Sequence, residues 1–471
     1  MSTISSPGVG SGLDVNTIVT KLVEIEKRPL TNLQTKATQL KTQLSLYGTI
    51  KSQVSTLGDA AAALANPDNW KVYTASSSNT AAVNVSANAS ASATSFSLEV
   101  TQMARAQTAA SKNVTQNATL GTAGDSGTLS IALGSWATGS FVGSGSSVDV
   151  TVNGDETLTQ IAAKINAANA GVTATVLRSG GQERLLFQSS TTGAAAGFQI
   201  ASAGFAGLDA LSLTSLSNPA ESSSGMQLGQ TGLDAVAKLN GVEVKSATNT
   251  LSEVVPGLTI QLSQVTSTPA QITVAQDKTA LQAKIQALAD AFTTVNKTLA
   301  DATKYVPGGV SGPLQGDSTT VGIQNVLSSI LGSSSTGSTF SRLSEIGLER
   351  QTDGSLKLNT TKLGTAMSSS LDEVKKLFTT DNSNQSTNGF GLKLRDFARG
   401  LIDSDGTVTT KTSAIQGSIS RNTTEQDKVN DRAARVQSML LKQYSSLDTV
   451  VSRYQGLNAY VSSQIAQWNK N

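Results

Sequence analysis

Apolar residues recur every seven positions at both ends of the chain and alternate with polar residues in the middle. From Leu33 one series runs at seven-residue steps, and a second series fills the positions between. The first comprises Leu33, Leu40, Tyr47, Val54 and Ala61, and the second comprises Ala37, Leu44, Ile50, Leu57 and Leu64. Heptads of this kind are typical of helices packed along a shared seam. We therefore expect a long helix from Leu33 that ends at Asn66-Pro67.

The C-terminal segment carries a cleaner heptad. It comprises Ala433, Leu440, Leu447, Tyr454, Val461 and Trp468, with Tyr444, Val451 and Ile465 in a neighbouring row. A helix with a single apolar stripe cannot bury that stripe alone. We expect the N-terminal helix of the same or a neighbouring chain to pack on it. The aromatic residues of this stripe fit core packing and a contact surface equally well.

A third long helix is expected between residues 279 and 305, because apolar residues there alternate steps of four and three. They are Leu281, Ile285, Leu288, Phe292, Val295, Leu299 and Ala302. Pro307-Gly308-Gly309 ends this helix. Shorter helices are predicted at residues 319–331 and 370–378, and Asp353-Gly354 predicts a hairpin turn.

Between about Val72 and Ala275 the period of the pattern changes to two, as in half-buried strands. Clear examples are Val83–Val85, Phe96–Val100, Val148–Val152 and Ile272–Val274. Asn153-Gly154 and Asn240-Gly241 are sequences of the hairpin type. Residues 150–176 and 238–260 resemble each other, and each segment predicts a strand, a turn, a short helix and a strand.

These patterns predict an α+β multi-domain fold. Both chain ends would build a helical coiled-coil leg, and a β-rich two-domain head would be inserted between them, as is tolerated when the termini of an insert lie close together. The predicted segments are a flexible N-terminal segment (1–32), the N-terminal leg helix (33–71), an inner head domain in two parts (72–110 and 228–275), an outer head domain (111–227), a helical leg domain (276–432) and a C-terminal heptad helix (433–471).

Composition narrows the classes of function. The 471 residues include no Cys and no His, which removes thiolate chemistry and the side chain that most often transfers protons near neutral pH. The net charge is only +2, and no basic stripe with interleaved aromatic residues indicates a nucleic-acid partner. No apolar run approaches 18 residues, so we expect no membrane insertion. Residues 1–12 lack the features of a cleaved secretory signal.

One glycine cluster is similar to a phosphate-binding loop; its members and neighbours are Gly8, Gly10, Gly12, Leu13 and Asp14. Too few residues precede it for the strand that such a loop needs. We interpret it as a flexible entry to a helix capped by Asp14 or Asn16. The acid pairs Asp155-Glu156, Asp372-Glu373 and Asp403/Asp405 lie at turns or helix starts, where structural roles explain them. We therefore expect no catalytic site, no metal and no cofactor.

Several short segments, each present once, follow one another along nearly the whole chain. In the first part they are Ile4–Asp14, Leu46–Lys51 and Val100–Gln107; later they are Leu314–Ser318, Ile346–Leu348, Asp353–Leu356 and Val374–Phe378. These segments resemble the motifs of the flagellar hook-associated protein 2 family, the caps of bacterial flagellar filaments. The repeated Asn-Gly segment is similar to a small module that flagellins also contain.

The resemblance implies a secreted protein at the extracellular tip of the flagellum, where a ring of about five copies caps the filament. Exported flagellin would fold and insert beneath this ring. Export would use the flagellar type III pathway, with a chaperone on the C-terminal helix. Further partners would be flagellin and the hook-filament junction protein, and surface adhesion by the head is left open.

Pattern and resemblance together predict the site residues. The N-terminal motif is the glycine cluster described above, and leg packing is expected at Leu33, Leu40, Tyr47, Val54, Leu281, Ile285, Leu288 and Phe292. The C-terminal seam for assembly and chaperone binding comprises Leu440, Leu447, Tyr454, Val461 and Trp468. Because residues 1–30 hold only the short stripe Ile18, Leu22 and Ile25, we expect both ends to be mobile in the free protein and ordered on the filament.

Other classes of protein share this plan. Another flagellar axial subunit, such as a flagellin-like or hook-filament junction protein, would polymerise openly, whereas a cap closes into a ring. A secreted adhesin would use the coiled coil as a stalk. An enzyme is the weakest alternative, because the chain offers no His, no Cys and no convergent cluster of acids.

Overall fold

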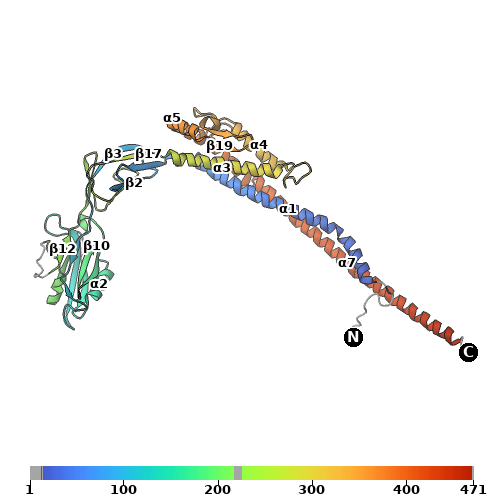
Figure 1. Cartoon of the computed structure of the whole chain (residues 1–471), viewed down its shortest axis with the longest axis horizontal. Coiled ribbons are helices and arrows are strands. Elements are labelled where there is room, and N and C mark those ends of the chain that lie inside the picture. Colours follow the sequence, from blue (N-terminus) through green and yellow to red (C-terminus); the bar gives the residue numbers. More distant parts are fainter. Residues whose placement is uncertain (1–11, 13, 217–224, 469–471) are drawn as a thin grey trace. The chain divides into compact units, whose positions relative to one another are not determined.

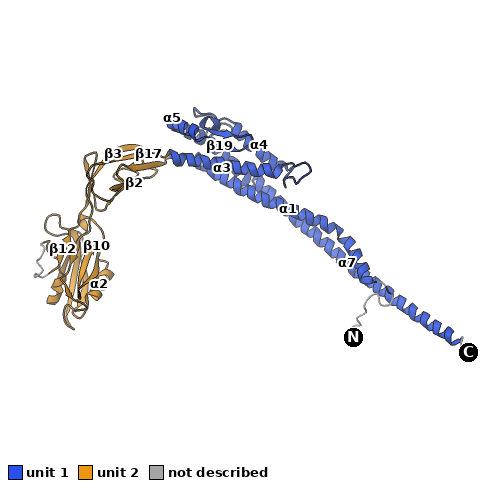
Figure 2. Cartoon of the chain, viewed as in Figure 1, with its two compact units in different colours: residues 1–70, 278–471 blue, residues 71–277 orange. Residues whose placement is uncertain are grey.

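The computed structural model describes residue 12, residues 14–216 and residues 225–468. It separates into two compact units, one of residues 1–70 and 278–471 and the other of residues 71–277 (Figure 2). Both chain ends therefore belong to the first unit, and the second unit is inserted between them. The long helices lie in the first unit and most strands in the second (Figure 1), so the α+β fold class is confirmed.

The first unit consists mainly of helices. Its elements are α1 (Val15–Ala65), η1 (Pro67–Trp70), α3 (Lys278–Thr303), α4 (Ser318–Gly332), η4 (Leu343–Ile346), β18 (Leu348–Arg350), β19 (Leu356–Leu358), α5 (Thr360–Thr379), α6 (Phe390–Ile402) and α7 (Thr407–Trp468). Helix α1 packs against α3, α6 and α7, and Figure 1 shows α1 and α7 side by side. β18 and β19 form a hairpin at Asp353-Gly354, where Gly354 has a φ of +81°.

The heptad residues lie in the core of this unit. On α1, Leu40, Tyr47 and Val54 are buried and Leu33 is half-buried. On α3 the residues expected at the leg seam are all buried; they are Leu281, Ile285, Leu288 and Phe292. Helix α1 ends at Ala65, where the Asn66 backbone N–H donates to the Ala62 carbonyl oxygen. The sequence period thus locates the face on which α1 and α3 pack.

The described part of residues 1–32, which were predicted as a flexible segment, is mostly helical. Helix α1 begins at Val15 and continues through Pro29, which removes one helical hydrogen bond. The helix persists because Val15, Val19 and Val23 are buried against α7, and this packing outweighs the local cost. Helical propensity alone would have favoured a break at Pro29.

Helix α5 is longer than the predicted helix at residues 370–378. It spans Thr360–Thr379 and is interrupted at Ser370, which has a φ of −157° and a ψ of 65°. Asn359 caps its start by accepting a 3.0 Å hydrogen bond from the Lys362 backbone N–H. The first half was missed because its Thr, Gly and Ser residues have weak helical propensity, and burial of Leu363 and Met367 compensates.

The second unit is built from strands and one helix. Its elements are β1 (Tyr73–Ser77), β2 (Val83–Ala87), β3 (Thr94–Gln102), β4 (Thr108–Ala110), β5 (Val114–Thr115), β6 (Ser126–Ser135), β7 (Val142–Gly143), β8 (Val148–Asn153), α2 (Leu158–Ala167), β9 (Val172–Ser179), β10 (Gln182–Ser189), η2 (Ala194–Ala196), β11 (Gly197–Ala203), η3 (Ala206–Leu211), β12 (Gln227–Gln230), β13 (Ala235–Leu239), β14 (Val242–Ser246), β15 (Thr250–Ser252), β16 (Leu258–Leu262) and β17 (Ala270–Gln276).

This unit contains two apolar cores. The sheets β1-β17-β3-β13-β14 and β15-β16-β2 enclose one core. The other lies among α2, the sheet β12-β4-β10-β5 with β9 beside β10, and the sheet β11-β6-β7 with β8 beside β6. Gln107, at the end of the segment that joins β3 to β4, is fully buried. Its side-chain amide donates to the Phe198 carbonyl at 2.8 Å and accepts from the Phe198 N–H at 3.1 Å.

The two similar segments of the sequence fold differently. Residues 150–176 form the predicted strand, turn, helix and strand, but Asn153-Gly154 leads into α2 and is not a β-hairpin turn. Residues 238–260 contain no helix, because Leu251 pairs with Ile260 as part of β15 and Pro256 follows too soon. Asn240-Gly241 does form a β-hairpin turn, with positive φ values of 47° and 87°.

Candidate assembly surface

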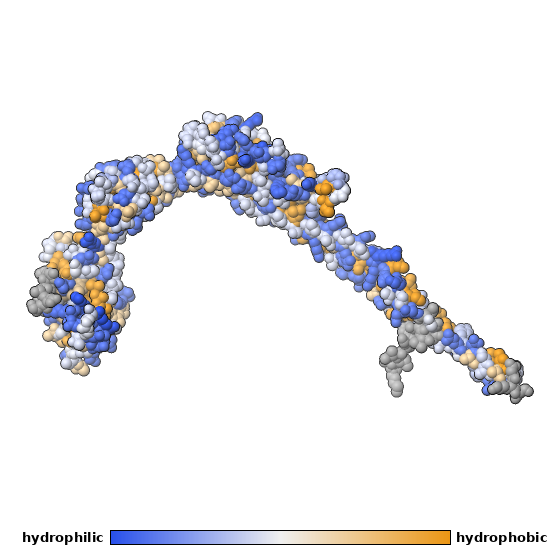
Figure 3. All heavy atoms as spheres, in the orientation of Figure 1, coloured by the Kyte–Doolittle hydropathy of each residue, from blue (hydrophilic) through white to orange (hydrophobic). Residues whose placement is uncertain are grey.

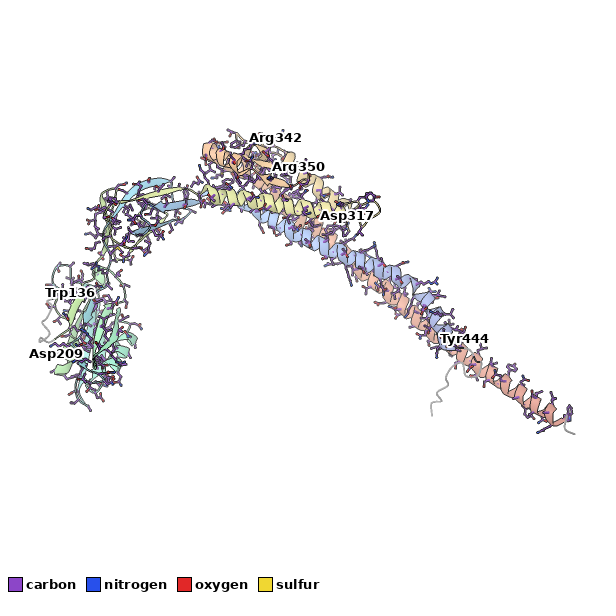
Figure 4. The ribbon with its side chains drawn as sticks, in the orientation of Figure 1. Trp136, Asp209, Asp317, Arg342, Arg350 and Tyr444 are labelled. Atoms are coloured by element: carbon purple, nitrogen blue, oxygen red, sulfur yellow. The ribbon has the colours of Figure 1, made fainter. Side chains whose placement is uncertain are left out.

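A polar cluster joins α1, α4 and α7 in the first unit. Asp317, at the start of α4 (Figure 4), accepts a 2.6 Å hydrogen bond from the Tyr47 hydroxyl of α1 and a 3.0 Å bond from the Thr320 backbone N–H. The Lys411 ammonium of α7 lies 2.6 Å from the other Asp317 carboxylate oxygen. Two of the sequence motifs, Leu46–Lys51 and Leu314–Ser318, therefore meet at this cluster.

The cluster changes the protonation of its members. Burial alone would raise the pKa of Asp317, but the hydrogen bonds from Lys411, Tyr47 and the Thr320 N–H outweigh it and lower that pKa to about 2. Burial, and next the hydrogen bond to Asp317, raises the pKa of Tyr47 well above its usual range. The carboxylate is therefore charged and the phenol neutral at physiological pH, which fixes the direction of their hydrogen bond.

At the start of α1, described residues of α1 and α7 form a small core. Val15, Val19 and Val23 pack on Ala433 of α7, with Leu440, Leu441 and Tyr444 partly buried beside them. Arg432 of α7 forms a 2.9 Å ion pair with Glu26 of α1. Figure 4 marks Tyr444 near the point where α1 begins beside α7. Leu440 is the one member of the expected C-terminal seam that lies at this core.

Beyond Tyr444 the seam of α7 continues without cover from other described elements. Exposed apolar residues recur there at steps of three and four, and Tyr460 is exposed beside them; the recurring residues are Leu447, Val450, Tyr454, Leu457, Val461, Ile465 and Trp468. Every side chain from Ser452 to Trp468 is exposed, and Figure 3 shows hydrophobic residues gathered along this end of α7. From Leu447 to Trp468 the stretch spans roughly 32 Å at 1.5 Å per residue. It is an apolar stripe with the spacing of a coiled coil, and no other described element covers it.

The N-terminal motif is only partly described. Gly8, Gly10 and Leu13 lie outside the described residues, and Gly12 has a φ of +75°. Asp14 is the N-cap of α1, because its carboxylate accepts from the Thr17 N–H at 3.0 Å and from the Thr17 hydroxyl at 2.5 Å. The hydrogen bond from the Thr17 side chain, followed by that from its backbone, lowers the pKa of Asp14. Of the two cap candidates, the structure selects Asp14.

Two features of this surface were not found from the sequence. We named Ile18, Leu22 and Ile25 as the short N-terminal stripe, but Leu22 and Ile25 are exposed and Ile18 is only half-buried. The buried stripe is the valine series at steps of four, a period that the sequence did contain. The Tyr47–Asp317–Lys411 cluster had no such signal, because no local spacing relates residues so far apart.

One acid in each of the pairs Asp155-Glu156 and Asp372-Glu373 has structural partners. Glu156 forms an ion pair with Lys164 and accepts from the Asn153 N–H at 3.1 Å. Glu373 pairs with Lys376 and accepts from the Thr339 N–H at 2.7 Å. Among the described residues, no group of three or more acids is placed to hold a metal ion. None of the described helices is long and apolar enough to cross a membrane.

A helical unit made of both chain ends, with a β-rich insert and an uncovered apolar stripe on the last helix, is an arrangement suited to a structural subunit of a larger assembly. Residues 11–107 match the model of the flagellar hook-associated protein 2 N-terminus, and residues 232–456 match that of its C-terminus. The chain belongs to the flagellar hook-associated protein 2 family. Residues 140–191 match the flagellin hook IN motif, which confirms the expected module around the first Asn-Gly segment.

Similar proteins span the same length. The flagellar hook-associated protein 2 of Escherichia coli strain K12 is 27% identical, over 98% of both chains. The A-type flagellar hook-associated protein 2 of Pseudomonas aeruginosa is 27% identical, over 95% of this chain and 94% of that one. The crystal structure of the D1-D2-D3 domains of the flagellar cap protein FliD from Escherichia coli is 26% identical, with a TM-score of 0.60. It covers 79% of this chain and 99% of that chain. These matches do not favour the other axial subunits or the adhesin.

Proposed function

We propose that this protein is the subunit of an oligomeric cap at the tip of the flagellar filament. About five copies would form the ring, beneath which exported flagellin folds and inserts. The observation that carries this proposal is the uncovered seam from Leu447 to Trp468, which continues the packed α1–α7 seam without a break. An exposed apolar seam of this length promotes aggregation of a free subunit. In an assembly it can serve as a binding surface for another helix.

The seam defines the contacts that we propose. On the filament it would pack against terminal helices of flagellin or of the hook-filament junction protein, since helices with complementary apolar stripes bury each other. Before export, a chaperone would cover the same residues. The protein would leave the cell by the flagellar type III pathway and act outside it, at the flagellum tip.

We propose a structural role without catalysis. Assembly proteins need packed seams and rigid supports rather than reactive groups, and the buried charges of the first unit serve such supports. Asp317 binds three elements together, and Lys393 of α6 donates to Ser333 and Ser334 at the end of α4. Each of these groups is engaged in holding helices in place.

The test is complementation of a strain that lacks the protein. A chain shortened after Gln443 removes the uncovered seam and leaves the α1–α7 core residues up to Leu441 in place. We expect cells with this variant to be non-motile and to shed monomeric flagellin into the medium. The matched control is Val242→Asp, a substitution of an exposed residue on β14. Normal filaments with the shortened chain would refute the proposed use of the seam.

A further inference from the structure

Strand β14 forms an open edge of a sheet in the second unit. It pairs with β13 on one side, and no other strand among the described residues pairs with its other side. Val242 of β14 is 67% exposed, although it lies on the same face of the sheet as the buried Ala235 and Ala237 of β13. The apolar face of this sheet is therefore incompletely covered at β14, and the edge can accept a further strand.

The hairpin of β13 and β14 determines which backbone groups face outward. Its two-residue loop closes on the hydrogen-bonded pair of Leu239 and Val242. Hydrogen-bonded and non-hydrogen-bonded pairs then alternate along the ladder, so the backbone N–H and C=O groups of Glu243 and Lys245 point away from β13. A strand added at this edge would bind to the backbone of these two residues.

Charges alternate in sign across the outer face of the same sheet. Glu99 of β3 lies opposite Lys238 of β13, and Lys238 lies opposite Glu243 of β14. The Lys238 ammonium lies 3.8 Å from the Glu99 carboxylate, and the Lys245 ammonium lies 3.3 Å from the Glu243 carboxylate. Unlike charges directly opposite each other stabilise neighbouring strands. A strand that continued this row would therefore place a cation opposite Glu243.

We propose that β14 pairs antiparallel with β14 of a second copy of this chain, with Val244 at the two-fold axis. In such a pair the outward backbone groups can meet in different registers. One register sets Glu243 opposite Glu243, another sets Lys245 opposite Lys245, and a third sets Glu243 opposite Lys245 at both ends. Like charges directly opposite each other destabilise a strand pair, so charge selects the third register. The cation that continues the row is then Lys245 of the second copy.

This register also pairs the apolar centre of β14. Val244 would face Val244 of the second copy in a non-hydrogen-bonded pair, where the two strands approach most closely. On either side, Glu243 and Lys245 would exchange about four backbone hydrogen bonds in total. Charged residues on an edge strand usually discourage pairing. Here they exclude the registers with like charges and leave the complementary one.

The symmetry of this contact separates it from the proposed ring. A two-fold contact joins copies two by two, whereas a ring repeats a contact between two different surfaces. The β14 contact therefore pairs free subunits outside the ring, where it covers an edge that otherwise promotes aggregation. Variants that break it should still restore motility to a strain that lacks the protein. Loss of motility in these variants would place β14 inside the cap and overturn this assignment, whereas the seam variants test the cap function itself.

Cross-linking tests the register, because the chain contains no cysteine. In the full-length Val244→Cys variant the two thiols would meet in the central pair, with Cα atoms about 4.5 Å apart, as a disulfide requires. Mild oxidation of the purified protein should give a covalent dimer. The matched control Val242→Cys carries a more exposed thiol, but its two copies would lie about 13 Å apart along the strands and should stay monomeric. Monomeric Val244→Cys, or equal dimer from both variants, would overturn the proposal.

Charge exchange provides a second measurement. Glu243→Lys and Lys245→Glu, each combined with Val244→Cys, should slow dimer formation by about tenfold or more, because like charges meet at both ends. A mixture of the two, with a tag on one of them, should form mixed dimers, since unlike charges meet again. The same result would show that both variants are folded. Unaltered dimer formation by Glu243→Lys, or a mixture without mixed dimers, would contradict the proposed register.

Discussion

The hydroxyl of Tyr47 donates a 2.6 Å hydrogen bond to the carboxylate of Asp317, although 270 residues separate them in the chain. The second oxygen of Asp317 is held by Lys411. Helices α1, α4 and α7 are thus joined at one carboxylate. The entire second unit is inserted in the sequence between Tyr47 and Asp317, so this bond helps to close the first unit across that insertion.

Asp317→Asn should destabilise the first unit by about 2 kcal/mol. The folded state lowers the pKa of Asp317 from 3.8 to about 2, and this difference is the extra stability that the charged form contributes. The carboxylate side chain is only 14% exposed, so solvent does not screen the pair strongly. Chemical unfolding followed by circular dichroism measures the loss. A loss of unfolding free energy below about 0.5 kcal/mol would mean that the charge of Asp317 contributes little to the stability of the first unit.

Stability should also depend on pH in a defined window. A carboxyl group whose pKa is lowered by folding contributes its stability above its unfolded pKa, and this contribution disappears as the pH falls through the folded value. For Asp317 the window lies between about pH 4 and pH 2. The difference in unfolding free energy between the parent chain and Asp317→Asn should shrink across this window. If the difference in unfolding free energy stayed constant across this window, the ionisation of Asp317 would not be its cause.

Leu447→Asp and Val19→Asp should behave differently in the free protein. Leu447 is 46% exposed, so its substitution should leave the unfolding temperature unchanged and impair only assembly and motility. Val19 is 2% exposed, and a carboxylate there would be buried without a partner. Hydrogen exchange should therefore show faster exchange over residues 15–28 and 430–444 in Val19→Asp alone. Equal effects of both variants would mean that a partner already covers Leu447.

Two glycines of α6 offer a matched pair. A Cβ atom at Gly391 would lie 2.8 Å from the Ala65 backbone nitrogen and from the Phe378 carbonyl oxygen, whereas nothing lies within 4 Å at Gly400. Gly391→Ala should destabilise the unit by about 1–3 kcal/mol through overpacking. Gly400→Ala should stabilise it by up to about 1 kcal/mol, because alanine favours the helix. Thermal unfolding should show a lower unfolding temperature for Gly391→Ala and a higher one for Gly400→Ala. Stabilisation by Gly391→Ala would contradict the close packing at that position.

The isolated fragment 71–277 should fold without the helices. Its two cores draw their buried residues from within residues 71–277. Thermal unfolding of the fragment should be cooperative, and the Gln107→Ala variant should unfold at a lower temperature, since two hydrogen bonds to Phe198 are lost. A fragment without a cooperative transition would show that the second unit depends on the first.

The sequence by itself determined most of the helices and strands of this protein, and it located the buried faces of α3 and of α1 from Leu33 onward. Period seven in α1 and α7, mixed steps of three and four in α3, and period two in the insert are local properties, because the geometry of a helix or strand converts spacing directly into a face. The order of motifs along the chain likewise sufficed to indicate the family. Helical propensity was a poor guide near Pro29 and Ser370. At both positions a helix continues on each side, because burial of neighbouring side chains outweighs the local loss of helical geometry or hydrogen bonding.

Only the tertiary structure decided which of those faces find a partner within the chain. The seam of α7 has the same period on both sides of Tyr444, yet it is packed before that residue and exposed after it, because α1 begins at Val15. In the same way, nothing local relates Tyr47 to Asp317. Such contacts depend on where separate elements come to lie in three dimensions, and the spacing of residues along one element carries no information about that.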